Sequence, residues 1–500
     1  MSATSPEART FFGHPRGLAT LYGTEFFERF SYYGLRAQLV LFVTLAASQG
    51  GLGLSAATAG AIYGLYTSSA YLMSVPGGWI ADRLLGQRRC VIVGGVLISA
   101  GNFLLAVPGT ALLFYFGLMI VAIGTGMLKP NASAMVGELY VDEPGARRDA
   151  AFSLFYMGIN LGATIGAVLA GGIGETLGYR WGFFTAGAAM LVGILWYSLS
   201  GRWLGTIGIE PKGTPPAERR RNAWIVLAAA ILMIVAVATI ASGRIEASAG
   251  DLAKWSFTFM VSLAVAFFGG VLLFGGLDAM QRRRVWVIMV FFLCGALFFA
   301  GYEQAGSTLN LFCRDLTDRS LFGSYFANGE HPAAWYQSVP SAYVILLAPF
   351  FAWLWIALGR RNLDPSAPLK FGIGLALLGL GFAVLMFAAK LIIADGGKVG
   401  PQWLLMTYLF HCCGELCLSP IGLSNVTKLA PPRYVSQMMG MWFLGTAMGN
   451  LAAGLIGGRI GSAVETMPGE FLNMTLYGVG AGVVMMLLSP VFRRWMGGIR

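Results

Sequence analysis

Four ionisable side chains interrupt an apolar stretch close to the N-terminus, namely Glu25, Glu28, Arg29 and Arg36. An α-helix turns by roughly 100° per residue, so these positions and Tyr32 fall within an arc of about 100° on one side. A charge at the centre of a membrane-spanning helix costs on the order of 2.5–3.5 kcal/mol on insertion scales. We therefore expect this charged stripe to face a hydrated cavity or charged partners, as a functional site would.

The composition indicates that this stretch lies in a polytopic membrane protein. Hydrophobic residues make up 56% of the chain and charged residues 11%, whereas soluble domains contain about 25% charged residues. Apolar runs recur at close to the length of about 20 residues that a helix needs to cross the hydrocarbon core. We predict an all-α fold with fourteen spans, at 18–46, 56–81, 89–107, 111–137, 149–174, 181–199, 222–242, 255–276, 285–309, 335–358, 370–394, 402–426, 435–457 and 471–492.

Basic residues concentrate in alternate loops and orient the chain. The intervening loops are nearly neutral apart from mixed-sign clusters such as Arg314, Asp315, Asp318 and Arg319. The positive-inside rule then predicts that both termini are cytoplasmic, and it accounts for the net charge of +11 without a nucleic-acid partner. The basic loop residues are Arg83, Arg88, Arg89, Arg147, Arg148, Lys212, Arg219, Arg220, Arg221, Arg282, Arg283, Arg284, Arg360, Arg361, Lys428 and Arg433, with Arg493, Arg494 and Arg500 in the tail.

The remaining polar chemistry is sparse. Residues 1–17 are polar, so we expect no cleavable signal peptide. The six cysteines lie mostly within or beside spans and are read as apolar fillers. No metal-ligand spacing and no nucleophile–base arrangement is apparent, so we predict no metal, no cofactor and no enzyme activity. His411 precedes Glu415 by one turn, and it either packs or hydrogen-bonds near that carboxylate.

The predicted spans divide into six, two and six. Residues 1–200 would form the first six-helix bundle, and 285–500 the second. Residues 201–284 would supply a polar cytoplasmic linker and two helices without ionisable groups in their interiors, suited to face lipid. After the second span, a loop resembles the cytoplasmic signature of the major facilitator superfamily, with a glycine turn and a carboxylate that can hold basic groups. Its residues include Gly78, Asp82, Arg83 and Gly86.

Three further ionisable residues lie deep in the predicted spans: Lys129, Glu303 and Glu415. The deep cations all come from the N-terminal half, and two deep carboxylates come from the C-terminal half. A cavity between the halves would be positive on one wall and negative on the other, which suits a zwitterion, with Tyr32, Tyr33, Tyr71 and Trp442 as adaptable lining. Alternatively, the charges only pin helices together.

The spacing also suits proton coupling. Glu25 and Glu28 lie within reach of Arg29 along the helix, and both could contact Lys129. A substrate carboxylate that competes for the cation would then drive a glutamate to take up a proton. A bridge between Arg36 and Glu303 could act in the same way as a gate.

Several motifs together resemble the bacterial proton-coupled oligopeptide transporters (the POT or PTR2 family), over nearly the whole chain. The first-helix residues Glu25, Glu28, Arg29, Phe30, Tyr33 and Gly34 resemble the family's hallmark motif. The segment with Phe155, Tyr156, Ile159, Asn160 and Gly162 resembles its fifth-helix signature. Arg36, Tyr71, Lys129, Glu303, Glu415 and Trp442 stand in contexts similar to those of the family.

The resemblance implies symport of di- and tripeptides with protons across the bacterial cytoplasmic (inner) membrane, driven by the proton gradient, by a monomer. It implies that Arg29, Arg36 and Lys129 face the peptide carboxylate, and that Asn160 and Glu415 receive its amino terminus. Tyr32, Tyr33, Tyr71 and Trp442 would line the pocket, with Glu25, Glu28 and Glu303 as proton-linked carboxylates. Pro340 departs from the asparagine usual at that position, which puts side-chain and length preference in doubt.

Two alternatives stay open. The first is a proton-linked facilitator of another small solute on the same fold, such as nitrate, an amino acid or a drug-like molecule. The second is a membrane enzyme or sensor, for which the sequence offers no catalytic arrangement.

Overall fold

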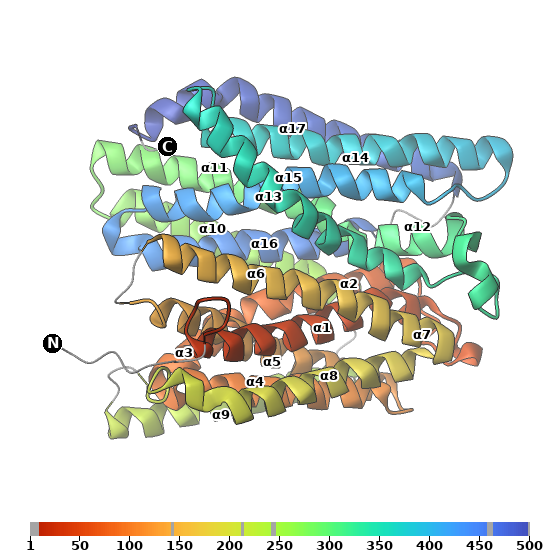
Figure 1. Cartoon of the computed structure of the whole chain (residues 1–500), viewed down its shortest axis with the longest axis horizontal. Helices are drawn as coiled ribbons and strands as arrows, with labels where there is room; N and C mark the ends of the chain where they lie inside the picture. Colours follow the sequence, from red (N-terminus) through yellow and green to blue (C-terminus); the bar gives the residue numbers. More distant parts are fainter. Residues whose placement is uncertain (1–9, 142–144, 212–214, 242–246, 458–463, 499–500) are drawn as a thin grey trace. The chain divides into compact units, whose positions relative to one another are not determined.

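A computed structural model describes residues 10–141, 145–211, 215–241, 247–457 and 464–498. Apart from two isolated β-bridges, these residues form helices, turns and loops (Figure 1). The helices are α1 Arg16–Thr44, α2 Ala56–Leu72, α3 Ser74–Ile80, α4 Gln87–Ala106, α5 Ala111–Glu138, α6 Ala146–Gly166, α7 Gly172–Leu177, α8 Tyr179–Ser200, α9 Pro216–Ala241, α10 Ala249–Phe274, α11 Ala279–Tyr302, α12 Thr308–Leu316, α13 Val339–Arg360, α14 Ala367–Asp395, α15 Gln402–Leu429, α16 Val435–Gly457 and α17 Met467–Trp495.

Twelve helical stretches among the described residues are long and apolar enough to cross a membrane. This confirms a polytopic all-helical protein. The predicted count of fourteen also includes α1 and α2, which are not among the twelve. Helix α1 carries the charged stripe, and α2 is only 17 residues long and ends before a turn at Met73.

The two central helices predicted to face lipid are present as α9 and α10. Along its apolar stretch, α9 is almost entirely uncovered by the rest of the protein, with 6% of the residues buried. Large side chains such as Trp224 and Leu232 are exposed on it. Such a surface is suited to hydrocarbon rather than to water.

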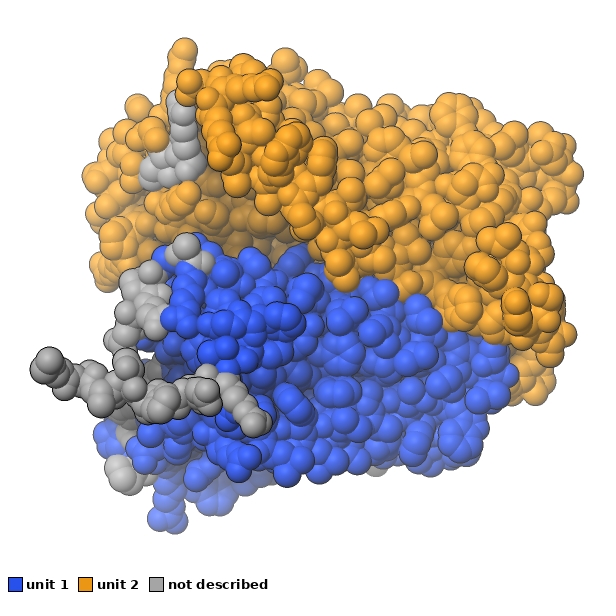
Figure 2. Space-filling model, in the orientation of Figure 1, with its two compact units in different colours: residues 1–38, 72–246 blue, residues 39–71, 247–500 orange. Residues whose placement is uncertain are grey.

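The chain separates into two compact units, coloured separately in Figure 2. Unit 1 comprises residues 1–38 and 72–246, and unit 2 comprises residues 39–71 and 247–500. Helix α1 therefore contributes to both units, and most of α2 belongs to unit 2. The predicted division at 200 and 284 stays a prediction.

In unit 1, glycines allow helix backbones to approach closely. A Cβ atom at Gly162 or Gly166 of α6 would overlap the carbonyl oxygens of Phe26 and Phe30 on α1. The absence of side chains at these two positions therefore lets α6 lie directly against α1. This contact places the fifth-helix signature beside the charged stripe.

In unit 2, α2 packs against α16 by the same means. A Cβ atom at Gly64 would lie 3.0 Å from the Leu451 carbonyl oxygen and 3.2 Å from the Gly454 Cα. A Cβ atom at Gly454 would overlap the carbonyl oxygen of Gly60. These close approaches fix the position of α2, which carries Tyr63 and Tyr71.

Candidate substrate and proton site

The charged stripe of α1 is buried and internally paired. Glu25 and Glu28 are 0% exposed and Arg29 is 4% exposed. The Arg29 guanidinium donates from Nε to Glu28 Oε2 and from Nη2 to Glu28 Oε1, the latter over 2.6 Å, which is a bidentate pair. Its Nε also lies 3.5 Å from Glu25 Oε1. The predicted pairing along the helix is therefore confirmed.

Aromatic rings complete the surroundings of the two arginines. The Arg29 guanidinium lies 4.7 Å from the ring centroid of Tyr32, and that of Arg36 lies 5.3 Å from the ring centroid of Tyr33. Arginine stacks favourably on aromatic faces. Both tyrosines therefore hold cationic side chains of the stripe, and Arg36 is itself buried.

Lys129 and Asn160 approach the stripe from other helices of unit 1. Lys129 is half-buried on α5 next to Pro130, and it is close enough to Glu25 to act on it electrostatically. Asn160 is buried on α6, where its Nδ2 donates to the Tyr156 carbonyl oxygen over 2.9 Å. The close contact of α6 with α1 is what brings the amide to this region.

The loop signature contains a glycine turn, at Gly86. Gly86 has a φ of 81°, in the left-handed region that favours glycine. Arg88 then donates to the carbonyl oxygens of Gly205 over 2.6 Å and Ile207 over 2.7 Å. Asp82 and Arg83, at the preceding turn, are exposed. The arginine thus connects this loop to the segment that follows the sixth predicted span.

In unit 2, Glu303 lies at a break in a helix. Helix α11 ends at Tyr302, Glu303–Gly306 form a 3₁₀ turn, and α12 begins at Thr308. Glu303 is 8% exposed, and its Oε2 accepts a hydrogen bond of 3.1 Å from the hydroxyl of Tyr63 on α2. Tyr63 was not among the residues predicted from the sequence, because it lies 240 positions from Glu303.

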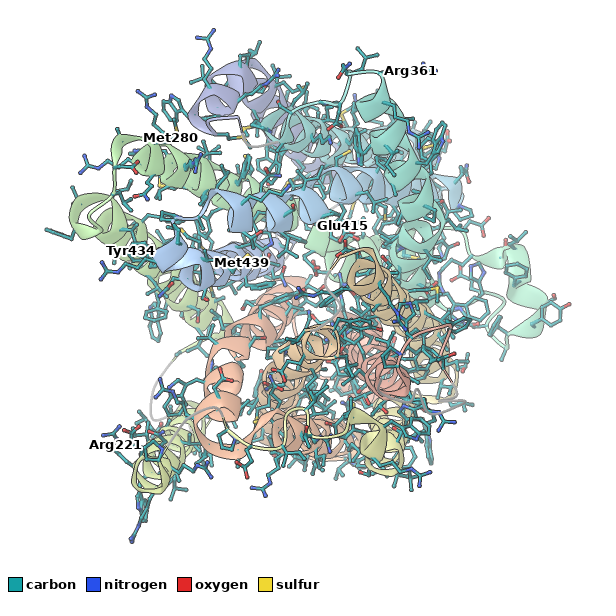
Figure 3. All side chains as sticks on the ribbon, turned by 60° about the vertical axis from the view of Figure 1, so that its left-hand side comes forward. Arg221, Met280, Arg361, Glu415, Tyr434 and Met439 are labelled. Atoms are coloured by element: carbon teal, nitrogen blue, oxygen red, sulfur yellow. The ribbon has the colours of Figure 1, made fainter. Side chains whose placement is uncertain are left out.

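Glu415 lies half-buried on α15, where Figure 3 labels it. One turn earlier, the Cys412 thiol donates to the Pro340 carbonyl oxygen over 3.4 Å. His411 packs against the ring of Phe382, with centroids 4.9 Å apart, as expected for a packed histidine. This arrangement joins the start of α13 to the helix that carries Glu415.

The two other predicted lining residues of unit 2 differ in exposure. Trp442 is buried on α16, and a Cβ atom at Gly422 of α15 would overlap its ring. Tyr71 is half-buried at the end of α2. The predicted site residues therefore form a paired cluster in unit 1 and separate positions on α2, α11–α12, α15 and α16 in unit 2. Within the described ranges, no group of three His, Cys, Asp or Glu side chains is placed to hold a metal ion.

Comparison with known proteins identifies the class. The model of the PTR2 family, described as the POT family, matches residues 88–467. The chain belongs to this family. It is 38% identical to the peptide transporter YePEPT of Yersinia enterocolitica, over 99% of this chain and 98% of the relative. It is 35% identical to a di-/tripeptide transporter of Lactococcus lactis, over 98% of each.

The fold agrees with that assignment. A crystal structure of peptide transporter POT in complex with alafosfalin superposes with a TM-score of 0.88 at 36% identity, covering 98% of this chain and 97% of the other. The protein is therefore a multi-pass membrane transporter of the peptide transporter family, and the relatives support a role other than catalysis.

Proposed function

We propose that this protein is a proton-coupled symporter that imports di- and tripeptides by alternating access between two six-helix bundles. In this proposal, fourteen spans cross the bacterial cytoplasmic membrane, with both termini inside and the proton gradient as the driving force. It works as a monomer. The peptide chemistry rests on what the relatives named above transport or bind.

The observation that carries the proposal is the buried Glu25–Glu28–Arg29 cluster. Two carboxylates share one guanidinium inside a helix of a membrane transporter. Carboxylates in contact with a cation stay ionised, and a carboxylate that loses its cation in a dry site takes up a proton. A peptide carboxylate that binds Arg29 would thus remove the cation from Glu25 or Glu28. That glutamate would then take up a proton.

The remaining roles follow from this chemistry. Arg29, Arg36 and Lys129 bind the peptide carboxylate, while Asn160 and Glu415 receive the amino terminus. Glu303 is a third proton-linked carboxylate, and Arg36 is its cationic partner. Tyr32, Tyr33, Tyr71 and Trp442 line the peptide site. In the loop signature, Gly78, Asp82, Arg83 and Gly86 shape a cytoplasmic turn at which the bundles rock.

Uptake into proteoliposomes tests the coupling. Labelled dipeptide uptake is measured with an inward proton gradient, and separately as exchange against internal dipeptide without a gradient. Glu28→Gln should abolish gradient-driven uptake and preserve exchange. Glu218→Gln is the matched control. Glu218 is 41% exposed on α9, and its Oε2 lies 3.9 Å from Arg221 Nη2 in an exposed ion pair. Full gradient-driven uptake by Glu28→Gln would contradict the assignment.

Substrate competition tests the amino-terminal contact. Unlabelled dipeptide should compete with labelled dipeptide, and an N-acetylated dipeptide should not, because acetylation removes the ammonium that Glu415 receives. Equal competition by both would show that the charge of the amino terminus is not recognised.

A further inference from the structure

The helix break that carries Glu303 is held in place by neighbouring elements. Ser307, between the 3₁₀ turn and α12, has φ −119° and ψ −89°, so the backbone leaves the helical path there. The Gln337 side-chain amide, at the entry to α13, donates to the carbonyl oxygen of Ala305 inside the break. A backbone carbonyl that the break frees from helical bonding is thereby satisfied.

Helix α2 holds the break from another direction through Tyr63. This side chain is completely buried, and its hydroxyl donates to Glu303. Gly306 makes room for it, because a Cβ atom there would lie 2.5 Å from two ring carbons of Tyr63 and would overlap its hydroxyl. The position of Tyr63 is set in turn by the close approach of Gly64 to α16. The contact is thus built from both sides.

We infer that Tyr63 is a positioning residue for the proton step at Glu303, and that it links the protonation of this carboxylate to the placement of α2. The inference rests on the proposed function, which assigns a proton to Glu303. It adds that Tyr63 and α2 respond to the protonation of Glu303.

The chemistry is a simple protonation. Ionised Glu303 accepts the Tyr63 O–H, and a hydrogen bond to the charged form of a carboxylate favours that form. An incoming proton adds to a carboxylate oxygen and gives a neutral acid, a weaker acceptor for the tyrosine, while Tyr63 keeps its own proton. The contact between α2 and the break is therefore strongest when Glu303 is ionised, and it loosens on protonation.

Within unit 2, the hydroxyl of Tyr63 on α2 donates to Glu303. Tyr302, the residue before Glu303 at the end of α11, places its ring near that of His411, with centroids 6.5 Å apart. Arg36 on α1 is the cation that the proposed function assigns to Glu303. Arg36 thus provides the charge, whereas Tyr63 provides direction and a connection to α2.

The pH profile of gradient-driven uptake tests the inference. Tyr63→Phe keeps the ring that fills the space beside Gly306 and removes only the hydroxyl. The external pH of half-maximal uptake should rise by about one unit, the size expected for one lost hydrogen bond to a charged group. Exchange without a gradient should stay within about twofold of the unmodified protein. Tyr197→Phe is the control, since the hydroxyl of this buried tyrosine lies 3.9 Å from the Met135 sulfur, in unit 1.

Two further variants separate the hydroxyl from general damage. Gly306→Ala displaces Tyr63 without altering it and should shift the profile in the same direction. Gly270→Ala on α10, where a Cβ atom would meet nothing within 4 Å, should not. Glu303→Gln should abolish gradient-driven uptake, so this background is tested by exchange without a gradient over a series of pH values. There, Tyr63→Phe should cause no additional change in the pH dependence of exchange. If Tyr63→Phe is not recovered as folded protein, Gly306→Ala carries the comparison.

The outcomes distinguish this inference from the function beneath it. If Glu303→Gln abolishes gradient-driven uptake but Tyr63→Phe and Gly306→Ala keep the unmodified profile, the role of Tyr63 is wrong and the proposed function stands. If Glu303→Gln itself retains gradient-driven uptake, the proton assignment of Glu303 is wrong and the inference falls with it. If Tyr63→Phe shifted the pH dependence of exchange in the Glu303→Gln background, the inference would also be overturned.

Discussion

The charged stripe of α1 and the break that carries Glu303 bury ionisable groups in two different ways. In α1, Glu28 and Arg29 are consecutive and Glu25 lies one turn away, so the helix itself brings opposite charges together. At the break, Glu303 accepts a hydrogen bond from Tyr63 on α2, 240 residues earlier. The first arrangement forms as soon as the helix forms. The second depends on how α2 packs, so it can report on the position of another helix.

The largest expected effect comes from removing the shared cation of α1. Arg29→Ala leaves two fully buried carboxylates without their guanidinium, and breaking a buried ion pair from one side costs about 3–5 kcal/mol. We expect a sharp loss of thermal stability in detergent together with loss of all transport. Arg89→Ala, on an exposed position of α4, is the control.

A lysine in place of Arg29 restores the positive charge without the bidentate geometry of the guanidinium. Arg29→Lys should recover part of the thermal stability but not the bidentate contact with Glu28, because an ammonium is a point charge. An Arg29→Ala protein as stable as the control would show that the carboxylates are neutral in the folded protein. The stripe would then not be a set of paired charges.

The next effect concerns the packing on which the break depends. Gly454→Val would force side-chain atoms into the backbone of α2 at Gly60 and Gly64, and such overpacking typically costs about 1–3 kcal/mol. We expect a lower melting temperature and, because Tyr63 moves with α2, a change in the pH profile of uptake. Gly269→Val on α10, where nothing lies within 4 Å, is the control. If the melting temperature changed but the pH profile of uptake did not, the packing of α2 would not influence the protonation of Glu303.

The difference between local and distant pairing also explains which features the sequence could predict. Twelve of the fourteen predicted spans follow from apolar length. The pairing of Glu25 with Arg29 follows from helical i,i+4 spacing, and that of Glu28 with Arg29 from their adjacency in the chain. The left-handed turn at Gly86 follows from glycine's freedom at positive φ. Each of these needs only residues that are close in the sequence.

Contacts between distant elements could not be predicted from one sequence. Nothing near Tyr63 distinguishes it from a packing tyrosine, and its partner becomes known only when α2 is placed against α16. The same is true of Lys398 and Glu330, 68 residues apart, which join two loops. The glycines Gly64, Gly162, Gly166 and Gly454 were a signal of close helix contacts, but they do not state which helices meet.

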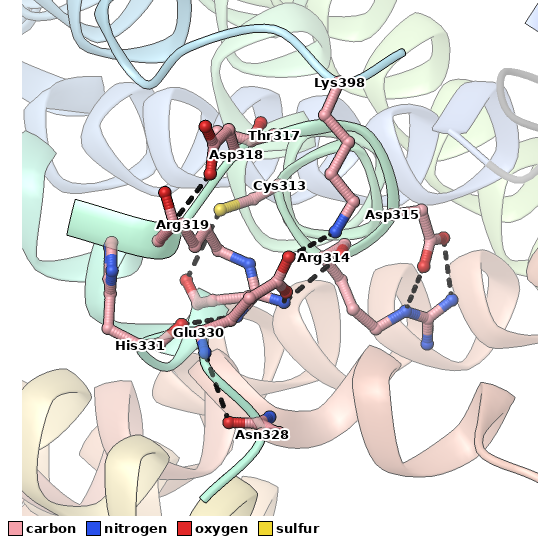
Figure 4. A network of polar contacts seen from close by, with 12 residues as sticks. Cys313, Arg314, Asp315, Thr317, Asp318, Arg319, Asn328, Glu330, His331 and Lys398 are labelled. Atoms are coloured by element: carbon pink, nitrogen blue, oxygen red, sulfur yellow. Dashed lines mark hydrogen bonds and ion pairs between the residues drawn. The ribbon is translucent and has the colours of Figure 1, made fainter. Parts of the chain in front are cut away.

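A third arrangement of charge lies outside the spans, in the segment 317–332 that follows α12 (Figure 4). His331 is buried there, in contact with the rings of Tyr336 and Trp335, and its Nε2 hydrogen-bonds the Tyr336 hydroxyl over 3.2 Å. Burial lowers the pKa of His331 from its usual value. A hydrogen bond with the Arg319 backbone opposes this lowering, as do the charges of Glu330 and Asp318, whereas the charge of Arg319 adds to it. The folded protein therefore favours the neutral imidazole.

This histidine predicts a pH dependence of stability. Since its pKa is lower in the folded than in the unfolded chain, its contribution is fully present above about pH 6.5 and is lost as the pH falls through the folded value. The melting temperature should thus fall more steeply between pH 7.5 and pH 5 for the unmodified protein than for His331→Gln. The pKa of Asp318 is lowered by hydrogen bonds from the backbone and side chain of Ser320, so this carboxylate is ionised in both proteins between pH 5 and pH 7.5. Equal slopes would contradict the prediction.

The smallest effect should come from the exposed member of the same network. Lys398 and Arg319 both contact the carboxylate of Glu330, but Lys398 is 40% exposed and Arg319 only 6%. Arg319 also donates to the carbonyl oxygens of His331 and Arg314. In Lys398→Ala, Glu330 keeps its bond to Arg319, so the loss should be about 0.2–1 kcal/mol and should vanish in high salt. Arg319→Ala removes the buried cation and leaves two backbone carbonyls without their donor, so its loss should be larger and should persist in salt. Melting temperatures of both variants at low and high salt measure the difference. If Lys398→Ala were the more damaging, exposure would not be what separates weak from strong charge pairs in this protein.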